Sequence, residues 1–158
     1  MTLQRASLTE RAAQRGFTLV EVLVALAVLA VGLLGIAALY LDSLRAGRTA
    51  IYRTQAINVA ADLADRIRAN RESSVTYDTD FGDAVATVPA CLTAVGCSAA
   101  EMAQHDLAEW KASLATLVPN GQGRVVVTAG NPNSYVITVQ WTEPGTDGAL
   151  SYTLTVES

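Results

Sequence analysis

The sequence predicts an α+β fold, in which a long N-terminal helix packs on a small antiparallel β-sheet with one short helix. Three observations support this fold: a charge-free run from Val22 to Leu41, apolar residues at helical spacing after that run, and alternating apolar residues near the C-terminus. The chain has 158 residues, a length typical of one compact domain.

The composition excludes several classes of protein. Hydrophobic residues make up 51% of the chain and charged residues 16%, whereas intrinsic disorder requires low hydrophobicity and high net charge. A multi-span transporter is excluded because only one segment is long and apolar enough to cross a bilayer. The formal net charge of -4 argues against binding to nucleic acid, whose phosphates require a basic surface.

The first apolar segment, Phe17–Leu41, is predicted to be a retained membrane anchor. As a helix it would rise about 37 Å, more than the roughly 30 Å of a hydrocarbon core. A secretory signal peptide has a shorter apolar region, of about 7–15 residues. Charge leaves the orientation of the anchor open, because three arginines precede it and three follow it. These are Arg5, Arg11, Arg15, Arg45, Arg48 and Arg53.

Glu21 places a carboxylate inside this apolar segment, which costs up to about 3 kcal/mol near the bilayer centre. One interpretation is that Glu21 lies within reach of the lipid headgroups. The other is that it pairs with a cation in an assembled state, because cleavage after Gly16 would create an α-amine on Phe17, one helical turn away. That amine could meet Glu21 of the same chain or of a neighbouring subunit. Such a buried pair sets register more than it adds stability.

A six-residue motif joins a short basic leader to the apolar segment: Gly16-Phe17-Thr18-Leu19-Val20-Glu21. The motif and its surroundings resemble the type III signal of type IV prepilins. The resemblance implies cleavage after Gly16 by prepilin peptidase on the cytoplasmic side of the bacterial inner membrane, and N-methylation of Phe17. It also implies a cytoplasmic leader and an exported C-terminal head, which resolves the orientation of the anchor.

Helical periodicity continues beyond the anchor. No proline interrupts residues 18–70, so one helix of about 80 Å is expected. The arginines near its end, Arg66, Arg68 and Arg71, are expected to form a solvated face. Apolar residues at spacings of 4, 3, 4 and 4 predict a stripe that docks on the head: Tyr52, Ala56, Val59, Leu63 and Ile67.

The segment 72–96 is predicted to be a loop. Its three aspartates, Asp78, Asp80 and Asp83, resemble a calcium-binding loop only in part. A glycine stands at the fifth position, and Pro89 stands where the bidentate glutamate belongs. A solvated acidic loop is therefore predicted, with no metal site and no cofactor.

Cys91 and Cys97 are the only cysteines in the chain. No second cysteine pair and no histidine cluster accompanies them to complete a metal site. In the oxidising periplasm, where the prepilin resemblance places the head, they are predicted to form a structural disulfide. Closure of this short loop would contribute roughly 2.4 kcal/mol on the chain-entropy estimate.

A short helix is predicted directly after the second cysteine, because Ser98 and Glu101 have the spacing of a capping box. His105, the only histidine, is expected on the surface. No nucleophile–base pair and no convergent carboxylates are found in the sequence, so no catalytic residue and no enzymatic activity are predicted. The apolar residues of this helix form one stripe for the core: Ala103, Leu107, Trp110, Leu114 and Leu117.

Three strands are predicted after this helix, at residues 124–129, 134–143 and 150–156. They form an antiparallel meander with one apolar face, which the N-terminal helix can cover. The apolar residues that alternate along the second and third strands define this face: Tyr135, Ile137, Val139, Trp141, Leu150, Tyr152, Leu154 and Val156.

This order of elements resembles the PilV-type minor pilins, also called type IV pilus modification proteins. Besides the N-terminal motif, the resemblance rests on the helix end Asn58–Asn70 and the strand Val139-Gln140-Trp141. It implies a type IV pilin-like fold in four parts. These are a cleaved leader (1–16), a transmembrane or fibre-core helix (17–41), an amphipathic helix half (42–71) and a periplasmic head (72–158).

The function that this resemblance implies is that of a minor pilin, which helps to initiate type IV pili or is incorporated into them for adhesion and twitching motility. The implied partners are other minor and major pilins, prepilin peptidase, the inner-membrane assembly platform and the lipid bilayer. A minor pseudopilin of a type II secretion system is the alternative, because it shares the signal and the anchor. A DNA-uptake pilin is disfavoured, because removal of the leader would leave 8 basic and 14 acidic residues.

Overall fold

The structure, a computed structural model, describes residues 16–158. These residues form two compact units, one that ends at Leu44 and one from Arg45 to Ser158. The helix α1, Leu19–Ala69, contributes residues to both units. Apart from Gly16, the predicted leader lies outside the described residues.

The helix α1 is 51 residues long and has no break, which confirms the predicted uninterrupted helix. All of its residues in the first unit are exposed, and its most apolar window has a mean hydropathy of 2.9. Among the described residues, α1 is the one helix long and apolar enough to cross a membrane. It begins at a cap, because Thr18 Oγ1 accepts a hydrogen bond of 3.2 Å from the backbone N–H of Glu21.

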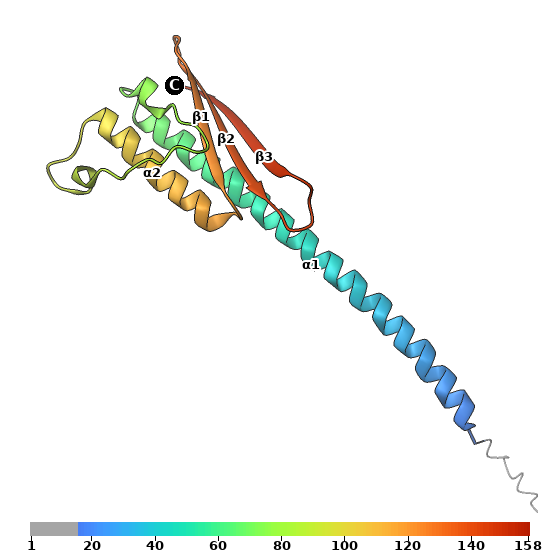
Figure 1. Ribbon diagram of the computed structural model, residues 1–158. Coiled ribbons are helices and arrows are strands. Elements are labelled where there is room, and N and C mark those ends of the chain that lie inside the picture. The colour runs from blue at the N-terminus through green and yellow to red at the C-terminus, as the bar shows by residue number, and fades with distance from the viewer. Residues whose placement is uncertain (1–15) are drawn as a thin grey trace, which may run out of the picture. The chain divides into compact units, whose positions relative to one another are not determined.

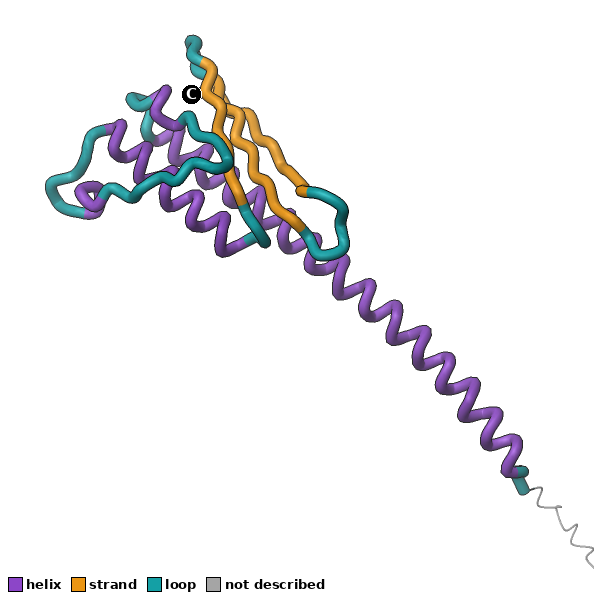
Figure 2. Tube along the Cα trace, in the orientation of Figure 1, coloured by secondary structure: helices purple, strands orange, loops and turns teal. Residues whose placement is uncertain are grey.

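The second unit combines the end of α1 with further helices and a sheet (Figure 2). The strands are antiparallel and lie in the order β1-β2-β3, which confirms the predicted α+β fold and its meander. The predicted loop 72–96 contains two short 3-10 helices. The elements after α1 are η1 (Ser74–Tyr77), η2 (Pro89–Leu92), α2 (Ala99–Leu117), β1 (Gln122–Thr128), β2 (Ser134–Thr142) and β3 (Ala149–Glu157).

The hydrophobic core of the second unit lies between one face of the sheet and two helices, α2 and the α1 residues from Arg45 onward (Figure 1). Apolar periodicity places α1 in this core, because residues three and four apart share one face of a helix. Tyr52, the first residue of the predicted stripe, is half-buried. The other four are buried: Ala56, Val59, Leu63 and Ile67.

The stripe on α2 differs from the prediction at its C-terminal end. Its first four residues are buried, but Leu117 is 40% exposed. The helix ends at Leu117, and Val118 leaves it with extended backbone angles. Val118, only 2% exposed, therefore enters the core in the place that helical periodicity assigned to Leu117.

The sheet follows the predicted alternation most closely in its central strand, β2. Four β2 side chains are buried on the helix-facing side: Tyr135, Ile137, Val139 and Trp141. Val125 of β1 and Leu154 of β3 are both paired with Ile137. On β3, however, Val156 is buried whereas Leu150, Tyr152 and Leu154 are only half-buried. The core is thus well covered at β1 and β2 and less well covered at β3.

Gly123 permits the close approach of β1 to α2. A Cβ atom at this position would overlap the ring of Trp110 and the side chain of Leu114. We expect Gly123→Ala to lower the free energy of unfolding by about 1–3 kcal/mol, because the buried indole cannot move away without strain. Urea denaturation of the full chain in detergent, followed by Trp fluorescence, measures this change.

Gly82→Ala is the matched control for this variant. No atom lies within 4 Å of a Cβ atom built at Gly82, so a change within about 0.5 kcal/mol is expected there. Equal losses of stability in the two variants would contradict the close approach at Gly123.

Candidate functional site

The residues of the N-terminal motif lie at the start of the described part of the first unit. Gly16 and Phe17 precede α1, and Phe17 is 83% exposed, so the peptide bond between them is accessible. Glu21 lies in the first turn of α1 and is exposed. The motif also caps the helix, through the hydrogen bond from Glu21 to Thr18. The spacing Thr-x-x-Glu could have predicted this cap from the sequence.

The rest of the first unit is an apolar helix surface. The exposed fraction of its large apolar side chains ranges from 46% for Val22 to 85% for Leu19. A helix that is apolar on all sides is covered in its working state by lipid or by other apolar helices. This surface, together with the accessible N-terminal motif, is the candidate functional site of the first unit.

Arg66 joins α1 to α2 and is not part of a freely solvated face, which corrects the prediction for this residue. Its Nη1 donates 3.0 Å hydrogen bonds to Asp106 Oδ1 and to Glu109 Oε2, and its Nε bonds Asp62 Oδ2 at 2.9 Å. Burial opposes the charged form, but the bonds to Glu109 and Asp106 prevail and raise the pKa of Arg66. The two partners on α2 lie 40 and 43 residues along the chain, so helical spacing could reveal only the contact with Asp62.

Tyr77 extends this polar network into the core. Its hydroxyl is fully buried with the rest of the side chain and donates a 2.8 Å hydrogen bond to Asp106 Oδ2. Asn70 Nδ2 donates to the same hydroxyl oxygen and to the carbonyl of Ala99. Burial raises the pKa of Tyr77. These hydrogen bonds join the end of α1 to η1 and to the start of α2. Asp106 accepts two of them, one from Arg66 and one from Tyr77.

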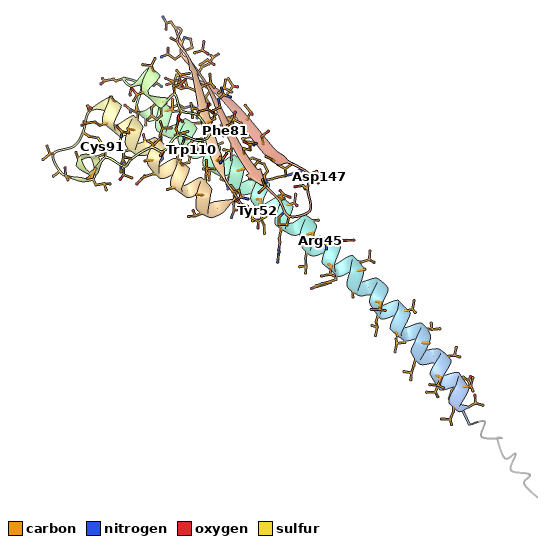
Figure 3. All side chains as sticks on the ribbon, in the orientation of Figure 1. Arg45, Tyr52, Phe81, Cys91, Trp110 and Asp147 are labelled. Carbon is orange, nitrogen blue, oxygen red and sulfur yellow. A yellow bond between two sulfur atoms is a disulfide. The ribbon has the colours of Figure 1, made fainter. Side chains whose placement is uncertain are left out.

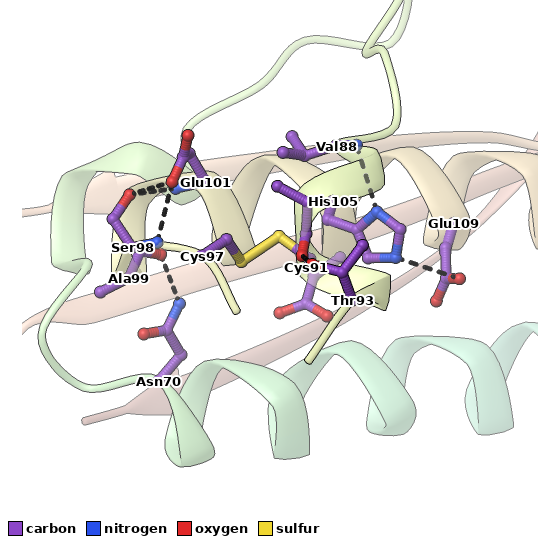
Figure 4. Close-up of a disulfide and its surroundings, with 12 residues drawn as sticks. Asn70, Val88, Cys91, Thr93, Cys97, Ser98, Ala99, Glu101, His105 and Glu109 are labelled. Carbon is purple, nitrogen blue, oxygen red and sulfur yellow. Dashed lines mark hydrogen bonds and ion pairs between the residues drawn. A yellow bond between two sulfur atoms is a disulfide. The ribbon is translucent and has the colours of Figure 1, made fainter. Parts of the chain in front are cut away.

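His105 is buried, with 5% of its surface exposed, so the prediction of a surface position was wrong. Its Nδ1 accepts a 3.2 Å hydrogen bond from the backbone N–H of Val88, and its Nε2 lies 3.4 Å from Glu109 Oε1 (Figure 4). Because Nδ1 accepts a hydrogen bond from the N–H of Val88, the proton of the neutral ring belongs on Nε2, toward Glu109. His105 thus fastens the segment before η2 to α2.

The predicted disulfide between Cys91 and Cys97 is present (Figure 4). Their Cα atoms are 4.8 Å apart, within the usual range for a disulfide. The bridge joins η2 to the residue before Ser98, which caps α2 through the predicted capping box with Glu101. The disulfide and His105 together hold the 84–97 segment against one end of α2.

Two aspartates of the acidic loop accept hydrogen bonds from backbone N–H groups, one in β1 and one within the loop. Asp78 Oδ2 accepts a 3.1 Å hydrogen bond from the N–H of Val127, and Asp83 Oδ2 accepts one of 2.6 Å from the N–H of Asp80. Lys111 donates to the carbonyls of Asp80 and Asp83. No group of three metal-ligating side chains occurs among residues 16–158.

Glu143 connects α1 to the end of β2. It is 8% exposed, and its carboxylate accepts hydrogen bonds from Thr49 Oγ1 at 2.6 Å and from Trp141 Nε1 at 2.9 Å. These two bonds hold the pKa of the Glu143 carboxyl below its ordinary value. Glu143 thus ties the first α1 residues of the second unit to the sheet. Figure 3 labels Tyr52, which lies three residues after Thr49 on α1 and so marks this stretch of the helix.

Two family models match adjoining parts of the sequence. Residues 11–37 match the prokaryotic N-terminal methylation motif, and residues 38–108 match the family described as type IV pilin Tt1218. No curated protein and no solved structure matches the chain. The matched segments include the six-residue motif, all of α1 and the disulfide loop.

Replacement of Arg66 by alanine is expected to lower the free energy of unfolding by about 2 kcal/mol, because buried Asp106 would lose its charged partner. Arg68→Ala is the control, since the ion pair of Arg68 with Asp65 is exposed and is worth at most about 1 kcal/mol. Urea denaturation of both variants in detergent tests this, and the same loss in both would show that the Arg66 network does not stabilise the fold.

The lowered pKa of Glu143 gives stability a defined dependence on pH. Its carboxylate contributes fully above its unfolded pKa of about 4.3, and the contribution is lost as the pH falls through the lower folded pKa. We therefore expect Glu143→Gln to be less stable than the wild type at pH 7, and the difference to shrink as the pH is lowered toward 3. Thermal unfolding across this range is the measurement, and a pH-independent difference would contradict it.

Proposed function

Because this chain is a type IV pilin that carries the prepilin methylation motif, we propose that it acts as a minor pilin of the PilV type. It helps to initiate assembly of type IV pili or is incorporated into them, in support of adhesion and twitching motility. The observation that carries the proposal is the exposed apolar surface of α1 in the first unit, which directly follows the motif. Type IV pilins are structural subunits, so the proposed role is assembly rather than catalysis.

The proposed mechanism is the transfer of one apolar helix between two apolar environments. In the membrane, residues 17–41 are covered by lipid, and in the fibre they are covered by the same segments of neighbouring pilins. Little hydrophobic free energy separates the two states, because lipid tails are about as apolar as leucine side chains. Direction and register then depend on a polar contact, for which the exposed carboxylate of Glu21 in the first turn is suited.

The proposed topology has a cytoplasmic leader (1–16) and a single pass through the bacterial inner membrane. The amphipathic half of α1 (42–71) and the head (72–158) lie in the periplasm, which is consistent with the disulfide between Cys91 and Cys97. Prepilin peptidase removes the leader, and the α-amine of Phe17 is methylated. The assembly platform of the inner membrane and other major and minor pilins are the proposed partners.

A minor pseudopilin of a type II secretion system is the second candidate, because the motif and the apolar helix serve both assemblies. A deletion strain separates the two functions. Loss of surface pili with normal secretion of exoproteins supports the proposed minor pilin. Loss of exoprotein secretion with normal pili would instead assign the chain to the secretion system.

The cleavage site is tested by Gly16→Val. A branched side chain next to the scissile bond is expected to block the peptidase, so the full-length precursor accumulates in the membrane. Intact-mass spectrometry of the purified chain measures this, and the wild type is expected to begin with a methylated Phe17. The control is Gly82→Val, at an exposed glycine of the head. A mature N-terminus other than Phe17 would refute the assigned site.

The role of Glu21 is tested with Glu21→Ala and Glu21→Gln. Both variants keep the backbone N–H that bonds Thr18, so the helix cap is preserved. Membrane insertion is expected to be equal or better in both, because a charge is removed from the apolar segment. Incorporation into sheared pilus fractions is expected to fall severalfold. Normal incorporation of both variants would show that the carboxylate does not set register.

A further inference from the structure

The two outer edges of the sheet differ in whether their backbone N–H and C=O groups have hydrogen-bond partners. The outer edge of β1 is covered by the chain itself, because Thr79 exchanges backbone hydrogen bonds of 3.0 and 2.9 Å with Val125. Asp78 Oδ2 also accepts the N–H of Val127. A backbone segment and a carboxylate therefore satisfy the outward backbone groups of Val125 and the N–H of Val127 on this edge.

The outer edge of β3 has no such cover. β3 spans Ala149–Glu157 and pairs with β2 on one side, and no described residue pairs with its other side. Figure 1 shows β3 at the margin of the sheet opposite β1. Natural proteins usually protect such an edge with lysine, proline, a bulge or a covering segment. From Ala149 to Val156 the strand contains no charged residue and no proline.

A partly apolar groove runs beside this edge, between β3 and α1. It has a volume of about 250 Å³. Leu150 and Tyr152 of β3 line it and are half-buried, and Ile57 of α1 is 44% exposed. The full lining is Arg53, Ile57, Trp141, Leu150, Ser151 and Tyr152. The core is therefore incomplete on the side of β3, next to the unpaired backbone groups.

We propose that the free edge of β3 receives an extended strand from a partner polypeptide, whose alternate apolar side chains fill the groove between β3 and α1. An edge strand presents N–H and C=O groups at every second residue, and another extended backbone satisfies them in register. Side chains of the added strand alternate between the two faces of the sheet, so every second one points toward Ile57 and Tyr152.

The occupant follows from the chemistry of the edge and its groove. A lipid or small molecule cannot satisfy a row of alternating backbone donors and acceptors, whereas an added strand can. The precedent is in the same sheet, where residue Thr79 covers β1 through its backbone. Arg53 at the groove is exposed, so an acidic side chain on the incoming strand would be matched in charge. The partner segment is thus extended, apolar at alternate positions and neutral or acidic.

The first experiment measures strand addition with a peptide probe. A fluorescein-labelled peptide with the sequence of Ser134–Thr142, the strand that pairs with β3 on its other side, is titrated with the full chain in detergent. Saturable binding by fluorescence anisotropy is expected. Two further peptides carry N-methyl groups at odd or at even positions, and each blocks one edge of the peptide. The peptide whose blocked edge faces β3 is expected to bind at least about tenfold more weakly than the unmodified peptide, and the other is expected to bind as the unmodified peptide does.

Two matched variants test the groove. Ile57→Glu places a charge in the groove and is expected to weaken peptide binding about tenfold, the ratio that corresponds to 1.4 kcal/mol. Ile51→Glu, at an isoleucine of α1 that is 56% exposed and outside the groove, is expected to bind as the wild type does. Both side chains are exposed enough for the fold to persist, which circular dichroism checks.

Three results would overturn the proposal. The first is the absence of saturable binding. The second is equal binding of both N-methylated peptides and the unmodified peptide, or equal binding by the two isoleucine variants. The third is a concentration-dependent dimer of the full chain in detergent that Ile57→Glu abolishes, because the occupant of the edge would then be a second copy of this chain.

Discussion

The second unit depends on the burial of Trp110 between two helices and the sheet. The indole ring is 1% exposed, lies against Gly123 of β1, and donates its N–H to the carbonyl oxygen of Val59 in α1 at 3.0 Å. A buried indole N–H without an acceptor would cost about 1–3 kcal/mol. One side chain of α2 therefore fixes the distance of α2 both from β1 and from α1.

Around this contact, α1 presents small residues to its neighbours. Ala56, Ala60 and Ala64 are spaced four residues apart and are at most 1% exposed, so the helix can pack closely along one face. Polar contacts then orient the pair of helices, with Arg66 bonded across to Asp106 and Glu109. The disulfide loop and the acidic loop are attached to this packed set of α1, α2 and the sheet and do not hold it together.

The chain thus uses one continuous helix for two kinds of burial. In the second unit, α1 is covered on one face by its own sheet and by α2, except at the groove beside β3. In the first unit, the apolar residues of α1 await cover from lipid or from other helices. The sheet repeats this difference on a smaller scale, because the middle of its β1 edge is covered by the chain and its β3 edge has no described pairing partner. Both open surfaces are suited to association with other subunits.

The sequence by itself determined the features that arise from neighbours along the chain. Periodicity along the chain is sufficient to predict the stripe on α1 and the alternation of β2. The residue types at neighbouring positions are sufficient to predict the charge-free run, the capping box at Ser98 and the six-residue motif. The tertiary structure alone decided the burial of His105, the partners of Arg66, the exposure of Leu117 and the difference between the two sheet edges. The physical reason is distance along the chain: Arg66 meets Glu109 across 43 residues, and His105 meets Val88 across 17. Such contacts form only when packing brings the segments together, and no periodicity records them.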